Sequence, residues 1–243
     1  MSATNSKPRS GRNNQDGSSV FAEEKAIGRP PVLTREAVLD AACDLARSQG
    51  LDFPMRTLSK ELGVSTMATY RYFKNREALE AAIIDCALGE ILERLEAIRT
   101  EIEPSQWREV FRRSSLANFE ILCTYPGVAN KLMLGALQSE NGLRLVEAQV
   151  GFLVELGLEE RRAAAIFQTV GLFIAEAASL EDARAQGKGD IEGLLEGAQA
   201  MEQKYPRAAS YIAFFADVSV RDRLILGIDF FAQAIEAELD RLD

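Results

Sequence analysis

Residues 57–79, TLSKELGVSTMATYRYFKNREAL, predict two short helices joined by a tight turn. Leu58 and Leu62 stand four residues apart, so the first helix has one apolar edge. Gly63 ends this helix as a C-terminal cap, and Ser65 can cap the next helix by accepting a hydrogen bond from a free backbone amide. Two helices separated by a short turn with Gly form a helix-turn-helix. Since an ordinary helical hairpin has the same pattern, the neighbouring sequence must decide between the two.

The second predicted helix has two chemically different faces. Thr69 and Phe73 fall on one face, which suits burial. The opposite face combines polar, basic and long side chains, namely Thr66, Met67, Tyr70, Arg71 and Lys74. One face therefore suits a protein core and the other suits DNA.

The flanking segments favour the helix-turn-helix over the hairpin. Residues 27–31, IGRPP, place Arg29 in a stiff extended segment that could lie in a minor groove, because proline fixes its own φ and restricts the residue before it. Thr34 then caps a helix that ends near Gly50, and Asn75 caps another helix after the motif.

These segments resemble the TetR family of one-component transcriptional repressors. The resemblance covers LTREAVLDAACDLARSQGL at residues 33–51 and TLSKELGVSTMATYRYFKNREALEAAIID at residues 57–85. The order GVS, a short variable stretch, YRYF, a polar cap and a leucine is that family's signature. The resemblance implies a DNA-binding head, and we expect base-edge contacts from Thr66, Met67, Ala68 and Arg71. The side chains expected to hold phosphates are Tyr70, Tyr72, Lys74, Arg56 and Arg76, with Arg29 in the arm.

The charge distribution agrees with a DNA-binding head on an acidic body. The chain has 28 Lys and Arg against 37 Asp and Glu, a net charge of −9. Residues 1–80 carry 12 basic against 10 acidic side chains, and the remaining residues carry 16 against 27. Because an acidic body repels phosphate, DNA binding should be confined to the head and should weaken with salt.

Composition also restricts the chemistry. The chain has no histidine, which excludes Ser-His-Asp and Cys-His arrangements and HExxH zinc sites. It has no GxxxxGK[ST] loop and no strand-linked GxGxxG. We therefore expect no catalytic residues, cofactor or metal, and the three cysteines are interpreted as small core residues in a reducing compartment. An all-helical enzyme and a helical adaptor for protein partners remain the alternative functions.

The rest of the chain predicts an all-α protein in three parts. Residues 1–24 form a disordered polar tail, 25–80 the helix-turn-helix domain, and 81–243 a larger helical domain for ligand binding and dimerisation. The most apolar run, 163–180, is interrupted by a Gln and a Glu, so a buried central helix is favoured over a membrane span. Without a signal-peptide core the protein is expected in the cytoplasm. Residues 186–206 are expected to be loose.

The body resembles the regulatory domain of the tetracycline-repressor branch of the family. The similar segments are PSQWREVFRRSSLANF, LRLVEAQVGFLVELGLEE, TVGLFIAEAASLEDA and LILGIDFFAQAIEAEL. The resemblance implies a pocket among the middle helices, lined by Leu92, Ser114, Asn118, Met133, Gln149 and Glu181, to which Phe119, Phe152 and Phe173 add apolar surface. That branch holds its drug and magnesium with histidines, and this chain has none. A small, largely apolar effector therefore fits better than a metal-chelated one.

Two helices predict a homodimer. The 163–180 helix is apolar nearly all round, and the last predicted helix, opened by a capping box at Ser219 and Asp222, spreads apolar residues over more than one face. Either one chain buries both helices, or a second copy of the chain covers them in a four-helix bundle. Such a bundle has two-fold symmetry, which matches the symmetry of a palindromic operator. The side chains expected in the dimer contact are Phe167, Leu172, Leu224, Ile228, Phe231 and Ile235.

Overall fold

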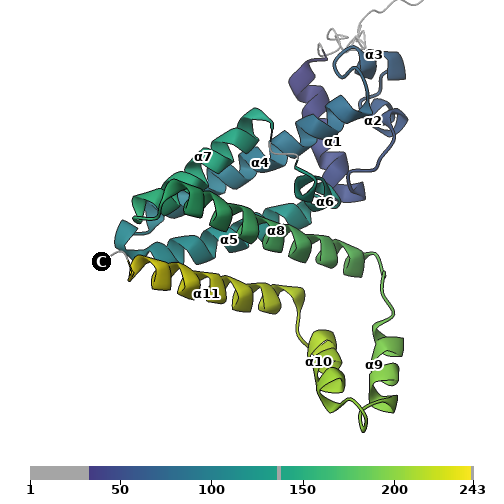
Figure 1. Cartoon of the computed structure of the whole chain (residues 1–243). Helices are drawn as coiled ribbons and strands as arrows, with labels where there is room; N and C mark the ends of the chain where they lie inside the picture. The colour runs from purple at the N-terminus through teal and green to yellow at the C-terminus, as the bar shows by residue number, and fades with distance from the viewer. Residues whose placement is uncertain (1–32, 136–137, 242–243) are drawn as a thin grey trace, which may run out of the picture. The chain divides into compact units, whose positions relative to one another are not determined.

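The computed structural model describes residues 33–135 and 138–241, and over these ranges it contains helices and no strand (Figure 1). The predicted all-α class is confirmed, whereas the 1–24 tail and Arg29 lie outside the described residues. The helices are α1 (Arg35–Gln49), α2 (Met55–Glu61), α3 (Thr66–Tyr70), α4 (Arg76–Glu101), a 3₁₀ turn (Pro104–Gln106), α5 (Trp107–Thr124), α6 (Val128–Met133), α7 (Glu140–Glu155), α8 (Glu160–Ala185), α9 (Ile191–Ala200), α10 (Pro206–Asp217) and α11 (Val220–Leu239).

The helix starts follow the predicted side-chain caps. Thr34 accepts a hydrogen bond from the Ala37 amide at 3.1 Å, and Asn75 accepts one from the Ala78 amide at 2.9 Å. Ser65 caps α3 and Ser219 caps α11 in the same way. Each cap satisfies a backbone amide that has no partner within the helix, so these boundaries are set locally by sequence.

α4 belongs to both parts of the protein. Its first half buries Leu79, Ile83 and Ile84, and it packs against α1 in the head. Its second half buries further apolar side chains, including Leu88 and Leu95, and it packs against α5 and α7 in the body. The predicted boundary at residue 80 therefore falls inside one continuous helix.

α8 is the central helix of the body. It contacts α5, α6, α7 and α11 (Figure 1). Of the described residues, α8 is the one helix long and apolar enough to span a membrane, by length and composition only. Only 28% of its most apolar window is buried within this chain, so a large part of its apolar surface faces outward.

The turn between α5 and α6 joins the body to the head. The Leu51 amide donates to the Pro126 carbonyl at 2.8 Å, and the Gly127 amide donates to the Asp182 carboxylate of α8 at 2.9 Å. Gly127 has a φ of 94°, and a Cβ at this position would lie 3.3 Å from the Leu51 Cβ. Glycine is therefore required here both by its backbone conformation and by the close approach.

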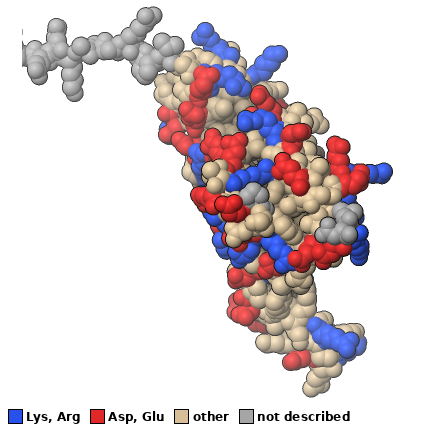
Figure 2. All heavy atoms as spheres, turned by 90° about the vertical axis from the view of Figure 1, so that its left-hand side faces the viewer, with Lys and Arg blue, Asp and Glu red and all other residues tan. Residues whose placement is uncertain are grey.

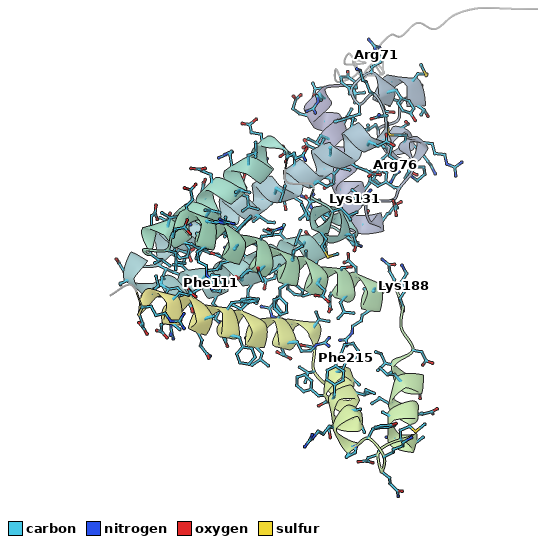
Figure 3. All side chains as sticks on the ribbon, in the orientation of Figure 1. Arg71, Arg76, Phe111, Lys131, Lys188 and Phe215 are labelled. Atoms are coloured by element: carbon cyan, nitrogen blue, oxygen red, sulfur yellow. The ribbon has the colours of Figure 1, made fainter. Side chains whose placement is uncertain are left out.

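The segment after α8 differs from the expectation. Residues 186–206 were expected to be loose, but α9 begins at Ile191, and together with α10 it forms a helical hairpin. The hairpin meets the body through the Phe215 ring, which points toward the start of α11 and lies under the guanidinium groups of Arg184 and Arg223 (Figure 3). The glycines near residue 190 suggested a loop, but Asp190 instead caps α9 through the Gly193 amide.

Asp182 makes the stability of this junction depend on pH. Burial raises the pKa of Asp182, although the hydrogen bond from Gly127 opposes that effect. Because the folded pKa lies above the unfolded one, this carboxyl stabilises the fold while protonated, and the contribution is lost as pH rises through the folded pKa. Asp182→Asn keeps the acceptor but does not ionise. In urea titrations at a series of pH values, the free energy of unfolding of the natural protein minus that of the variant should fall as pH rises above the ordinary pKa of an aspartate, about 3.9. A difference that is constant with pH would contradict this assignment.

Candidate functional site

Two buried hydroxyl groups hold α3 against α2. The Ser59 and Thr69 hydroxyl oxygens lie 3.1 Å apart and are also bonded to the Met55 and Thr66 carbonyls of their own helices. Phe73 is buried beside them with the Arg35 guanidinium over its ring. The predicted inward face of this helix is confirmed, and its opposite face is left toward solvent.

The outward side of α3 presents the predicted DNA-binding side chains. Met67 is 74% exposed and Tyr70 is 40% exposed, and Arg71 is also exposed at the outer end of the head (Figure 3). α3 ends at Tyr70, so Arg71 caps it and Lys74 lies in the following turn, not in a longer helix as expected. The exposed residues expected to contact DNA are Arg56, Met67, Tyr70, Arg71 and Lys74, with Thr66 and Ala68 half-buried beside them.

Two residues expected to hold phosphates have partners inside the protein. The Tyr72 hydroxyl donates to the Leu33 carbonyl. The Arg76 guanidinium donates to the Leu51 carbonyl at 2.7 Å, to the Phe53 carbonyl, and to Glu80 at 2.7 Å. Both side chains therefore donate within the protein, Tyr72 to a carbonyl that precedes α1 and Arg76 to two carbonyls between α1 and α2, and their phosphate contacts stay a prediction.

The Arg76 contacts extend into the body. Glu80 also pairs with Lys131 of α6, at 3.0 Å, so the carboxylate joins the first turn of α4 to a helix of the body (Figure 3). Glu80 is largely buried and Lys131 half-exposed, which makes this pair stronger than two freely solvated charges. No pattern in the sequence predicted this pair, because a contact between residues so far apart in the chain leaves no local signal.

A cavity of about 320 Å³ lies in the body beside these connecting helices. It is bordered by α4, α5, α6, α7 and α8, and its lining is mainly apolar. Asn118 and Met133, both predicted pocket residues, line it, together with Phe167 and Gln168. A smaller cavity of about 40 Å³ adjoins it, and its lining includes the predicted residues Ser114, Asn118, Gln149 and Phe152.

Asn118 lines both cavities and has an unsatisfied polar atom. Its Oδ1 is buried and has no hydrogen-bond partner among the described residues. A buried carbonyl oxygen without a partner costs about 1–3 kcal/mol. A ligand that donates a hydrogen bond at this point would remove that cost, so Asn118 is the strongest candidate for a polar ligand contact.

Four other predicted pocket residues line neither cavity. Phe119 of α5 is buried in the core. Leu92 is buried in the packing of α4, Phe173 packs edge-on against Phe231 of α11, and Glu181 is exposed near the end of α8. Their assignment by resemblance is not supported, because their side chains are absent from the lining of both cavities. The lining residues that the sequence did not predict include a stripe of small and apolar side chains along α8, namely Ala164, Phe167, Gly171, Ile174 and Ala175.

Two family models match this architecture. The model described as "Bacterial regulatory proteins, tetR family" matches residues 38–83, and "Tetracyclin repressor-like, C-terminal domain" matches residues 102–223, about half of the chain. The chain belongs to the TetR family. Residues 38–83 include the helix-turn-helix, and residues 102–223 include the lining of both cavities except for Leu88 and Ile91 of α4.

Individual relatives agree with this membership. The chain is 31% identical over 130 residues to the class D tetracycline repressor protein of Escherichia coli, and this match covers 53% of the chain and 57% of that repressor. It is 27% identical over 165 residues to the class C repressor of Escherichia coli, with 65% of the chain and 73% of that protein covered. The chain thus spans little more than half the length of the class D repressor.

Solved structures support the same fold. ActR of Streptomyces coelicolor, in complex with actinorhodin, matches with a TM-score of 0.72 at 20% identity, covering 85% of this chain and 98% of ActR. TetR of Acinetobacter baumannii AYE matches with a TM-score of 0.55 at 23% identity, covering 82% of this chain and 98% of that one. At these identities the likeness concerns the fold alone.

Several residues expected at the dimer contact of this TetR-family chain are buried within one subunit. Leu224, Ile228 and Ile235 are at most 1% exposed and face the body's own core, which corrects the prediction. Phe167 lines the cavities, and Phe231 is half-buried against Phe173. Leu172 remains 44% exposed, and the exposed apolar residues of α11 are instead Leu226 and Phe230. The apolar stripe of α11 that the sequence pattern had assigned to the dimer contact therefore lies in the core of the single chain.

Charged side chains are distributed unevenly over the surface. Positive groups gather at the upper end in Figure 2, near the head, whereas acidic and basic groups alternate over the body. The lower end, formed by α9 and α10, is mostly uncharged and exposes Met201, Tyr211 and Phe214. The two ends therefore suit different kinds of contact.

Proposed function

We propose that this TetR-family chain is a cytoplasmic homodimeric repressor that binds a palindromic operator and is released by a small, largely apolar effector. The observation that carries the proposal is the exposed side of α3 together with the apolar cavity connected to the head through α4 and α6. The relatives named tetracycline repressors are the reason to favour repression over activation.

DNA binding is supported by the composition of the outward side of α3. Arg71 can pair bidentately with a guanine, and Thr66, Met67 and Ala68 supply small or apolar contacts to base edges. Arg56, Tyr70 and Lys74 would hold phosphates and set the register of the head. A protein adaptor would not need this combination of exposed basic and base-contacting side chains.

A dimer is supported by the outward apolar surface of α8 and α11. Leu172, Leu226 and Phe230 are each more than 40% exposed, and apolar side chains of this size gain free energy when a partner removes them from water. Two copies related by a two-fold axis would cover these side chains reciprocally and present two heads to the two halves of a palindrome.

Release by an effector is supported by the position of the cavity. Leu132 and Met133 line it from α6, whose Lys131 pairs with Glu80 at the head, and Leu88 and Ile91 line it from α4. A ligand that fits one position of α4 and α6 better than another shifts the separation of the two heads. Operator affinity then falls by no more than the ligand's differential affinity for the two arrangements.

An enzyme is the weaker alternative. The family model and the relatives describe regulators, and the cavity is lined mainly by apolar groups, with amide and hydroxyl groups as its polar ones. Turnover of a compound that binds the cavity would contradict the proposal.

Replacing Arg71 by Ala should relax sequence preference. We expect about 1–3 kcal/mol less discrimination at one base pair in each half-site, measured with an operator library in gel-shift assays. Lys74→Gln is the matched comparison. It should weaken all sequences alike and reduce the slope of log affinity against log salt by about 1 per head. If Arg71→Ala keeps the full preference, Arg71 does not read a base.

Replacing Gly171 by Leu should block effector binding. Gly171 lines both cavities, and a Cβ there would have no atom within 4 Å, so the larger side chain extends into open space. Compounds that raise the melting temperature of the natural protein and release its operator should do neither with the variant. Gly151→Leu on α7 is the control, since it also meets open space and lines neither cavity. Equal compound binding by both variants would place the effector elsewhere.

Replacing Phe230 by Glu should weaken the dimer. Phe230 is 60% exposed in one chain, and loss of a central aromatic contact costs about 2 kcal/mol or more, about a 30-fold rise in dimer dissociation constant. Sedimentation equilibrium measures this constant. Leu143→Glu, at a residue 62% exposed on α7, introduces the same charge and should leave the dimer intact. If Leu143→Glu weakens the dimer more than Phe230→Glu does, the interface lies on α7 and not on α11.

A further inference from the structure

Two cysteines meet where the head packs against α4. Cys43 on α1 is buried and Cys86 on α4 is half-buried. One turn further along the same two helices Arg47 pairs with Glu90 at 2.5 Å, so both thiols lie in the same stretch of the α1–α4 interface. They lie on helices that pack together but are far apart in sequence. Two thiols in contact across a helix interface can form a covalent link without unfolding either helix.

A group of polar side chains surrounds the half-buried thiol. The Tyr125 hydroxyl lies 4.0 Å from the Cys86 Sγ and donates to Glu90 at 2.5 Å. The Arg47 guanidinium pairs with Glu90 at 2.5 Å and lies 4.7 Å above the Tyr125 ring. Arg47 thus brings a positive charge to the site, and α1, α4 and the end of α5 all contribute to it.

The two thiols differ in acidity. The interaction with Cys43 lowers the pKa of Cys86 to about 7, and Tyr125 and Arg47 act in the same direction against burial and Glu90. The same interaction between the thiols, together with burial, raises the pKa of Cys43. Since the thiolate is the reactive form, Cys86 is the nucleophile of the pair and Cys43 its buried partner.

We propose that Cys43 and Cys86 form an oxidisable pair that hydroperoxides convert to a disulfide linking α1 to α4. The Cys86 thiolate attacks the peroxide: an S–O bond forms, the O–O bond breaks, and the alkoxide or hydroxide leaves and takes up a proton. The Cys43 sulfur then attacks the sulfenic sulfur and loses its proton, the S–OH bond breaks, and water leaves. In sum, two thiols and one hydroperoxide give a disulfide, one alcohol or water from the peroxide, and one further water. Only Cys86 needs access to solvent, because the second step occurs inside the interface.

The link would also affect DNA binding, a consequence that rests on the proposed function. A covalent bond holds two sulfurs at about 2 Å, closer than any two unlinked thiols, so it draws α1 and α4 together at this point. It also removes the thiol contact with Tyr125 and thereby disturbs the Tyr125–Glu90–Arg47 group. Because α1 is part of the head and α4 continues into the body, the head is held at a changed angle. We expect at least about a fivefold loss of operator affinity, restored by dithiothreitol.

Hydrogen peroxide is the probe for the full chain. After treatment, remaining thiols are alkylated, and peptides are mapped by mass spectrometry without reduction. We expect a linked Cys43–Cys86 peptide, two hydrogen atoms lighter than the separate peptides, with Cys123 alkylated. Cys123→Ser is the matched control and should behave like the natural protein, because burial and nearby acidic groups raise the pKa of Cys123 to about 12. Cys43→Ser should stop at the Cys86 sulfenic acid, trapped by dimedone.

The peptide map decides the proposal on the natural chain, without DNA and without any substitution. Unmodified Cys43 and Cys86 after peroxide treatment, or a link that joins either of them to Cys123, would overturn it. If the linked peptide forms and operator affinity is unchanged, the predicted effect on the head is wrong. A chain that forms the link but binds no operator in either redox state would contradict the proposed function, not the oxidisable pair.

Discussion

The structure depends on the burial of α4 along its whole length. A helix of 26 residues that is covered by α1 at one end and by α5 and α7 at the other cannot shift without exposing apolar side chains in both parts. Each fully buried Leu or Ile contributes about 1.5–3 kcal/mol, so the packing resists independent movement of the head. Movement therefore has to be shared, which is the physical basis for coupling a cavity in the body to the head.

Polar contacts at the junction fix the register of this packing. The Leu51–Pro126 hydrogen bond, the bond from Gly127 to Asp182 and the pairing of Arg76 with Glu80 tie the α1–α2 connection to α4, the α5–α6 turn and α8. The ion pairs are partly exposed and individually weak. Their geometry is specific, however, and a small movement of α6 beside the cavity changes it. The Cys43–Cys86 contact lies in the same interface, so ligand and oxidant would act on the same pair of helices.

The sequence predicted the local features of the fold and of the DNA-contacting helix. Caps at Thr34, Ser65, Asn75 and Ser219 depend on residues three positions away, and the two faces of α3 follow from helical spacing. Predictions about long-range partners were less successful. Arg76 looks like any surface arginine in the sequence, and only folding brings the Leu51 and Phe53 carbonyls within its reach. The pocket was half predicted, since Asn118 and Met133 line it while Leu92 and Glu181 do not.

What the sequence alone determined is the all-α class, the helix-turn-helix, the family and the acidic body, because these follow from short-range periodicity, capping and composition. Tertiary structure decided which apolar stripe of α11 faces its own core and which faces outward, since a stripe has no partner until the other helices are in place. It also decided that Asn118 has an unpaired oxygen beside a cavity, within the described part of the chain, and that two cysteines far apart in sequence share the α1–α4 interface. Each of these depends on where separate helices meet, which only the packing of the whole chain specifies.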